Sequence, residues 1–235
     1  MRNYIILNGV MSTTISGLLI QELPPISKPM IRTQIEEIDG RDGDIVTPLG
    51  YSAYNKEFTI GLYGDFDIDE IISYFNSNGT VTFSNEEDKY YNYEILEQID
   101  FERLVRYRTA TVTMHVQPFK YSSTDNKKVF NITGSTTSVS IRNVGNIYSK
   151  PKLIINGTGI IEISLNNQGI FNIDLGSYNS ITIDTNLMEA YNGNTLLNRQ
   201  VTGDYSNFKL NVGNNTITWS GNVTSIEIDN YSRWI

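Results

Sequence analysis

The stretch RYRTATVTMHVQPF, residues 106–119, alternates apolar and polar side chains along most of its length. One face of the extended chain carries Ala110, Val112, Met114 and Val116. The opposite face carries threonines, His115 and Gln117. A period of two with one apolar face indicates a β-strand that is buried on one side and wet on the other.

The same alternation recurs on both sides of this stretch. It appears before it at Phe58, Ile60 and Leu62, and after residue 129 in many short segments separated by turn signals such as NGTG, NNQG and GSYNS. Residues 153–155 and 161–165 are expected to be separate strands on either side of NGTG. Residues 217–219 and 226–228 are likewise expected to be two separate strands. A further strand is expected at residues 208–212. Many short strands at regular spacing predict a mainly β protein with β-sandwich architecture.

A single helix is expected, at about residues 67–78. Asp67 is followed three residues later by Glu70, which is the spacing of a capping box. The apolar residues that follow at helical spacing are Ile68, Ile71, Ile72 and Phe75. Asn78-Gly79 supplies a signal for the end of the helix.

Charge and composition change along the chain and suggest two domains. Residues 1–128 hold 12 basic and 19 acidic residues, whereas residues 129–235 hold 6 and 7 and are rich in asparagine. The segment KYSSTDNKKV, at residues 120–129, is polar and aperiodic, and it follows Pro118, which is expected to end a central strand. We therefore expect an N-terminal domain at 1–120, a linker at 121–129 and a C-terminal sandwich at 130–235.

The bulk composition excludes several classes of protein. The 235 residues carry a net charge of −8, and no block of lysine and arginine stands out, which disfavours direct gripping of nucleic acid. The chain has no cysteine, so disulfide scaffolds and thiol chemistry are excluded. No apolar run approaches the roughly 20 residues that span a membrane. We expect a protein without membrane insertion.

No catalytic, metal or cofactor site is predicted. His115 is the only histidine and lacks the sequence context of a catalytic triad. Asp65, Asp67 and Asp69 alternate as at the start of an EF-hand loop, but the later glycine and glutamate of that loop are missing, which favours a helix cap. The tyrosines at 90, 91, 93 and 107 favour packing across a sheet, while an interface or a sugar-binding face stays open.

The segment EEIDGRDGDIVTPLGY, residues 36–51, contains two Asp-Gly pairs around Arg41. Asp-Gly pairs favour tight turns because glycine accepts positive φ and aspartate bonds nearby amides. Three interpretations stay open: a structural turn, a turn that presents its charges to a neighbouring subunit, and a metal site. The candidate turn and interface residues are Gly40, Arg41, Asp42, Gly43 and Asp44.

Taken in order, the motifs of the chain resemble those of the distal tail proteins (Dit) of long-tailed phages that infect Gram-positive bacteria. The resemblance rests on ILNGV at 6–10, LPPI at 23–26, GRDG at 40–43, VTMHVQPF at 112–119, KPKLIINGTG at 150–159, NVGNNTITWSG at 211–221 and the final RWI. It covers nearly the whole chain. The chain differs in having Asp39 before GRDG, where a proline is common, and in lacking a long insertion that carries an extra carbohydrate-binding module in some relatives.

The resemblance implies two β-sandwich domains, the first with one helix and the second galectin-like. It also implies a homohexameric ring that joins the tail tube protein to the tail-tip or baseplate proteins, with a lysin-type hub protein and the tape-measure protein as further partners. DNA would pass through the channel without specific binding. The expected location is the distal end of the virion tail, after assembly in the host cytoplasm.

Two other functions are considered beside this structural hub. A carbohydrate-binding adhesin is the alternative from a different class, and an acidic-residue glycosidase comes third. The sequence nominates no carboxylate pair for the latter.

Overall fold

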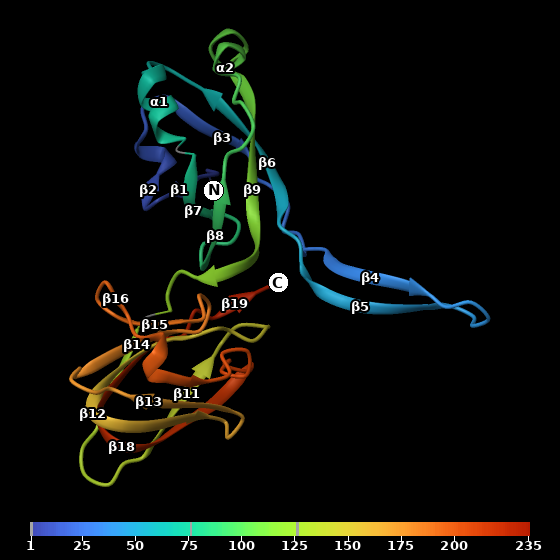
Figure 1. Cartoon of the computed structure of the whole chain (residues 1–235). Coiled ribbons are helices and arrows are strands. Elements are labelled where there is room, and N and C mark those ends of the chain that lie inside the picture. Colours follow the sequence, from blue (N-terminus) through green and yellow to red (C-terminus); the bar gives the residue numbers. More distant parts are fainter. Residues whose placement is uncertain (1, 76, 126) are drawn as a thin grey trace. The chain divides into compact units, whose positions relative to one another are not determined.

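The structure is a computed structural model that describes residues 2–75, 77–125 and 127–235. It contains two compact units, one ending at Ser123 and one from Thr124 to Trp234. Most elements are antiparallel strands, so the predicted mainly β class is confirmed (Figure 1). The strands β9 and β10 reach into residues 121–129, at Ser122 and Lys128.

The first unit is built on one antiparallel sheet with the strand order β2-β1-β7-β8-β9-β6-β3. Its strands are β1 (Ile5–Leu7), β2 (Val10–Met11), β3 (Leu18–Glu22), β6 (Tyr54–Leu62), β7 (Asn78–Phe83), β8 (Lys89–Glu94) and β9 (Thr109–Ser122). A short 3-10 helix, η1 (Ser12–Thr14), follows β2. The predicted alternation in β9 is confirmed, because Val112, Met114 and Val116 are fully buried.

Strand β9 continues through Pro118, so the prediction that this proline ends the strand is wrong. The pairing of β8 with β9 shifts register between Tyr91, which faces Lys120, and Tyr93, which faces Val116. Pro118 lies within this irregularity. A proline is tolerated at a bulge because no ladder hydrogen bond is required from its nitrogen.

Helix α1 (Ile68–Tyr74) is where the sequence predicts a helix, and the Asp67 cap is confirmed. The Asp67 carboxylate accepts hydrogen bonds from the backbone N–H groups of Asp69 and Glu70, at 2.9 and 3.4 Å. The predicted end at residue 78 is wrong, since Asn78 and Gly79 already pair with Glu94 and Tyr93 as the start of β7.

A second helix, α2 (Phe101–Tyr107), corrects the expectation of a single helix. Asp100 caps it by accepting a 2.8 Å hydrogen bond from the Arg103 N–H, and Leu104 enters the core. Glu102 and Arg106 form an i,i+4 ion pair on its exposed side. The helix ends at Arg108, whose φ of 58° is left-handed.

The second unit is a β-sandwich built around two long strands, β12 (Lys152–Leu165) and β18 (Gly213–Asp229). The other strands of its sheet are β10 (Lys128–Asn131), β11 (Ser138–Asn143), β13 (Gly169–Asp174), β14 (Ser180–Asp184), β15 (Glu189–Asn192), β16 (Thr195–Leu196) and β17 (Val201–Gly203). A 3-10 helix, η2 (Asn198–Gln200), follows β16, and the short strand β19 (Arg233–Trp234) lies outside this sheet. The first half of β12 pairs with β14, and its second half pairs with β13. The long strands therefore serve both layers of the sandwich around one core.

From the sequence, each of the two long strands is expected to be two short ones. The structure corrects this expectation. NGTG is a bend within β12, where the pairing with β18 shifts at residues 156–162. The backbones approach closely there: a Cβ on Gly157 would lie 2.3 Å from the Asn222 carbonyl oxygen, and one on Gly221 2.3 Å from that of Ile160. The strand expected at residues 208–212 is also absent from the described second unit; Phe208 and Leu210 are buried, and Leu210 forms only an isolated bridge with Ser149.

Candidate subunit interface: the β4–β5 arm

Residues 31–51 form a separate two-stranded ribbon, the arm, made of β4 (Ile31–Glu37) and β5 (Asp44–Tyr51). Its pairing runs from Ile31 opposite Tyr51 to Glu37 opposite Asp44. At its base, the Ser52 N–H donates to the Met30 carbonyl at 2.8 Å. Figure 1 shows the ribbon leaving the sheet of the first unit, and every residue from 31 to 44 is exposed.

The GRDG motif is the tip of the arm. Residues 38–43 close the hairpin, with a hydrogen bond of 3.1 Å from the Arg41 N–H to the Ile38 carbonyl. Gly40 and Gly43 have φ of 80° and 78°, and no atom lies near the place of a Cβ. Glycine is therefore required here by backbone conformation and not by crowding. In the structure, this segment forms the turn of the hairpin.

The structure brings the five candidate residues together in this exposed tip. Gly40, Arg41, Asp42 and Gly43 lie in the loop, and Asp44 begins β5. Across residues 2–75, 77–125 and 127–235, Arg41 forms no ion pair within its own chain. The role of these residues toward another subunit stays a prediction.

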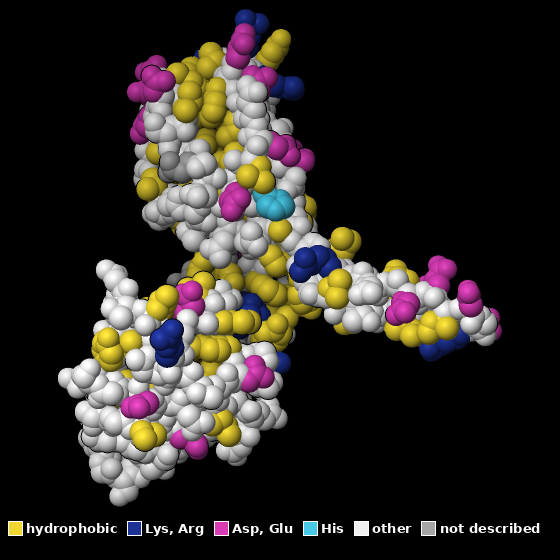
Figure 2. Space-filling model, in the orientation of Figure 1, with side chains coloured by type: hydrophobic (Ala, Val, Ile, Leu, Met, Phe, Trp, Pro, Cys, Tyr) yellow, Lys and Arg dark blue, Asp and Glu magenta, His cyan; other side chains and the backbone are white. Residues whose placement is uncertain are grey.

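One face of the arm is apolar. Ile31 lies opposite Tyr51 and Ile35 opposite Val46, and alternate positions of a ribbon share a face. The exposed fractions of Ile31, Ile35 and Val46 are 43%, 60% and 57%. Figure 2 shows hydrophobic side chains along the arm and charged ones toward its outer end. An exposed apolar face on a two-stranded ribbon is a candidate interaction surface.

The root of the arm is tied to the sheet by side chains that donate to backbone carbonyls of residues 24–27. The Lys56 Nζ donates to the Pro25 carbonyl at 2.7 Å, and the Asn85 Nδ2 to the Pro24 carbonyl at 3.1 Å. The Tyr54 hydroxyl adds a longer bond of 3.4 Å to the Ser27 carbonyl. Side chains of β6 and of the β7–β8 turn thus hold the segment that leads into the arm.

Lys56 belongs to a buried charged cluster. Lys120 and Tyr91 donate to the two carboxylate oxygens of Glu86, at 2.8 and 2.6 Å. The Lys56 ammonium lies 4.9 Å from the centre of the Tyr91 ring, a cation–π contact. Burial lowers the pKa of Lys56 to about 8, against the opposing attraction of Glu86 and with a further lowering by Lys120. Burial and the Glu86 carboxylate together raise the pKa of Tyr91.

The other residues considered from the sequence give weaker support for a functional site. In the described segments, no group of three or more histidine or acidic side chains is arranged to hold a metal ion. A hydrogen bond of 2.9 Å joins the His115 Nδ1 to the Asn55 Oδ1, the amide oxygen being the acceptor. Of the four noted tyrosines, Tyr91 and Tyr93 are buried, Tyr90 stacks on Tyr121 at 5.6 Å, and Tyr107 is 70% exposed.

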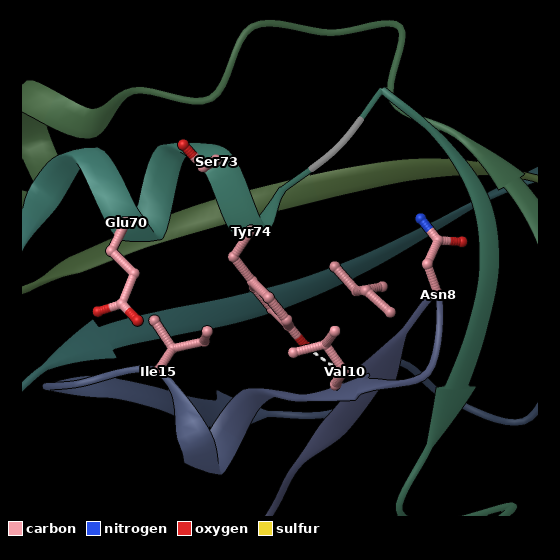
Figure 3. Close-up of a pocket in the computed structure, with 7 residues that line it drawn as sticks. Asn8, Val10, Ile15, Glu70, Ser73 and Tyr74 are labelled. Atoms are coloured by element: carbon pink, nitrogen blue, oxygen red, sulfur yellow. Dashed lines mark hydrogen bonds between the residues drawn. The ribbon is translucent and has the colours of Figure 1, made fainter.

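A cavity of about 260 Å³ lies between α1 and the β1–β2 hairpin (Figure 3). Apolar side chains of Leu7, Val10 and Ile15 line it, with Glu70 at the helix. The Tyr74 hydroxyl donates to the backbone, with the Ile5 and Val10 carbonyls both at 3.2 Å, and burial raises the pKa of Tyr74. The cavity thus presents one carboxylate and no paired catalytic groups among its lining residues.

Two comparisons by sequence, with family models and with curated proteins, find no match. Among solved structures, the chain is similar to the SPP1 Dit protein, described as a paradigm of the hub adsorption apparatus in phages that infect Gram-positive bacteria. The TM-score is 0.66 at 16% identity, over 97% of this chain and 98% of that one. The chain has the fold of the SPP1 distal tail protein.

The distal tail fold extends over both units, since nearly the whole of each chain is superposed. A chain of the phage P2 baseplate in its activated conformation with Ca is also similar, with a TM-score of 0.51 and 11% identity over 97% of both chains. The resemblance in fold predicted from the ordered motifs is therefore confirmed. Within the described residues, no helix is both long and apolar enough to cross a membrane.

Proposed function

We propose that this protein is a structural hub of a phage tail. Six copies form a ring through their first units, and the ring joins the tail tube to the tip or baseplate proteins. The observation that carries the proposal is the full-length match to the fold of a phage hub protein. The protein acts as a scaffold in this proposal and performs no catalysis.

The arm supplies the contact that a ring requires. A closed ring uses heterologous contacts, in which a surface of one copy meets a different surface of the next. The arm is exposed, apolar on one face and anchored at its root. In the ring, the arm lies against the neighbouring copy, and the tip residues Arg41, Asp42 and Asp44 present their charges to it.

The acidic first unit suits a channel for DNA. Residues 1–128 carry 12 basic and 19 acidic residues. A wall of this charge repels the phosphate backbone and lets DNA slide without being held. The ring joins the tail tube protein to a lysin-type hub protein, with the tape-measure protein as a further partner, at the distal end of the tail, after assembly in the host cytoplasm.

Negative-stain electron microscopy of the purified protein tests the proposal. Rings with a central hole at micromolar concentration are expected. Monomers at every concentration, together with binding to cell-wall glycans on an array, would contradict the hub function and support a carbohydrate-binding adhesin. No feature of the described surface favours that alternative over the hub.

A further inference from the structure

Helix α2 presents an exposed surface that the first unit leaves uncovered. Arg103, Arg106 and Tyr107 share the solvent side of the helix, because residues three and four apart are neighbours there. Tyr107 is 70% exposed, and Leu96 in the preceding loop is 69% exposed. Tyrosine and arginine on one uncovered surface are typical of the centre of a protein interface.

The surface around α2 carries three acidic and three basic side chains, which differ in how far they are paired within the chain. The acidic residues Glu97, Asp100 and Glu102 lie before the helix or in its first turn, and the Asp100 carboxylate is engaged as the cap. Arg103 lies in the first turn beside Glu102, Arg106 lies in the last turn, and Arg108 follows the helix as its C-cap. Arg106 is paired with Glu102, and Arg108 covers the Phe66 ring at 4.8 Å. Within the described part of the chain, Arg103 has no carboxylate partner.

The arm carries a net negative charge, which complements the positive charge of Arg103. Residues 31–51 contain two basic side chains, Arg32 and Arg41, and five acidic ones, a balance of −3. The acidic residues are Glu36, Glu37, Asp39, Asp42 and Asp44, all around the tip. An apolar ribbon with an acidic end thus matches an exposed tyrosine flanked by arginines.

The two surfaces lie at opposite ends of one strand. Strand β6 begins at Tyr54, close to the arm root, and ends at Leu62, whose N–H donates to the Arg108 carbonyl just after α2. A strand of this length spans about 30 Å. Figure 1 shows the arm pointing away from α2 of the same chain. A contact between the two surfaces therefore joins different copies.

We propose that the arm of one copy docks on the α2 surface of the next, with its apolar face on Tyr107 and its acidic tip beside Arg103. The inference rests on the proposed ring and names the surface that receives the arm. The contact is heterologous, because the donor and acceptor surfaces differ, and it can repeat around a closed ring.

Cysteine cross-linking tests this contact directly, since the chain has no native cysteine. The test pair is Thr33→Cys with Glu102→Cys, which leaves the named arginines, Tyr107 and the arm isoleucines intact. The control pair is Thr33→Cys with Glu87→Cys, at an exposed site on the β7–β8 turn. Each double variant is isolated as rings and treated with a short bismaleimide. We expect inter-subunit ladders on denaturing gels from the test pair only.

A charge reversal gives an independent readout. Arg103→Glu is expected to raise the protein concentration at which rings half-dissociate by about tenfold, whereas Arg199→Glu, an exposed reversal in the second unit, leaves it unchanged. Intact rings without test-pair ladders would overturn the α2 assignment and leave the hub standing. A wild-type protein that forms no rings would overturn the proposed function itself.

Discussion

Lys56 holds Pro25 in place: the buried ammonium donates a 2.7 Å hydrogen bond to the Pro25 carbonyl, in the segment that leads into the arm. The carbonyl of the preceding residue, Pro24, accepts a hydrogen bond from the Asn85 Nδ2. The segment that leads into the arm is therefore tied to the buried cluster of Lys56, Glu86 and Lys120.

The stability of the first unit is expected to depend on the charge of Lys56. Burial lowers the folded-state pKa of Lys56 from 10.5 to about 8, so between these values the unfolded chain binds more protons than the folded one. Stability contributed by Lys56 therefore rises with pH through this window and is absent below it. Urea unfolding of wild type and Lys56→Met at pH 7–10 measures it.

The difference in unfolding free energy between wild type and Lys56→Met should shift in favour of wild type as pH rises. Measurements stop at pH 10 because the raised pKa values of Tyr54 and Tyr91 act in the opposite sense above it. A difference that is constant from pH 7 to pH 10 would contradict the assigned burial of the ammonium.

Glu86→Gln should be strongly destabilising, because it removes the carboxylate that faces buried Lys120. Leaving a buried charge without its partner costs about 3–5 kcal/mol. The matched control is Glu87→Gln, at an exposed position where the carboxylate accepts a hydrogen bond from Tyr4. Urea unfolding should show a large loss for the first variant and less than about 1 kcal/mol for the second. Equal losses of unfolding free energy in the two variants would show that the buried cluster does not stabilise the first unit.

Gly221→Ala tests the close approach of β18 to the bend in β12, which the sequence pattern does not reveal. Gly221 has φ of 92°, and an added Cβ would lie 2.3 Å from the Ile160 carbonyl oxygen. Gly213 has φ of 90° with no atom near, so Gly213→Ala carries the backbone strain alone. We expect Gly221→Ala to cost about 1–3 kcal/mol more than Gly213→Ala in unfolding experiments. Similar costs would show that the strands can move apart freely.

The bend shows where sequence patterns reach their limit. Alternation placed the buried residues of β12 and β18 correctly, but glycine and asparagine at 156–159 and 220–222 carry the same signal for a hairpin turn and for a bulged strand. Only the pairing partners distinguish the two, and these are distant in sequence. The predicted strands at 153–155 and 161–165 were therefore real segments of one longer strand.

Helix α2 was missed although its signals are local. Asp100 before the helix and the Glu102–Arg106 spacing are present in the sequence, but seven residues with one fully buried side chain, Leu104, give no clear apolar stripe. For the arm, the Asp-Gly pairs predicted the turn. The bonds from Lys56 and Asn85 to the segment before the arm join residues 31 and 61 positions apart, and local sequence patterns do not reveal such contacts.

Limited proteolysis addresses the proposed division into domains. Residues 121–129 contain the segment between β9 and β10, and exposed backbone outside strands is cut first. We expect an early cut there, and a fragment of residues 130–235 that keeps a β-type circular dichroism spectrum. An unfolded fragment would mean that the second unit depends on the first.

Arg41→Ala should leave the fold unchanged and weaken assembly. Arg41 is exposed at the arm tip and forms no ion pair within the described chain, so its removal should alter the monomer by less than about 0.5 kcal/mol. In a ring, each copy repeats the contact, and arginine can bind a carboxylate with two hydrogen bonds. Sedimentation should show fewer rings at equal concentration. If Arg41→Ala forms as many rings as the wild type, GRDG is only a structural turn.

The most direct measurement of the central claim is the mass in solution of the full-length protein and of an arm-shortened variant. In that variant, residues 32–50 are replaced by Asn-Gly, which closes a tight hairpin between Ile31 and Tyr51. Light scattering coupled to size exclusion should give six times the chain mass of 26.6 kDa for the wild type and a single chain for the variant. A wild type of one chain mass at all concentrations, or a variant that still forms hexamers, would contradict the account.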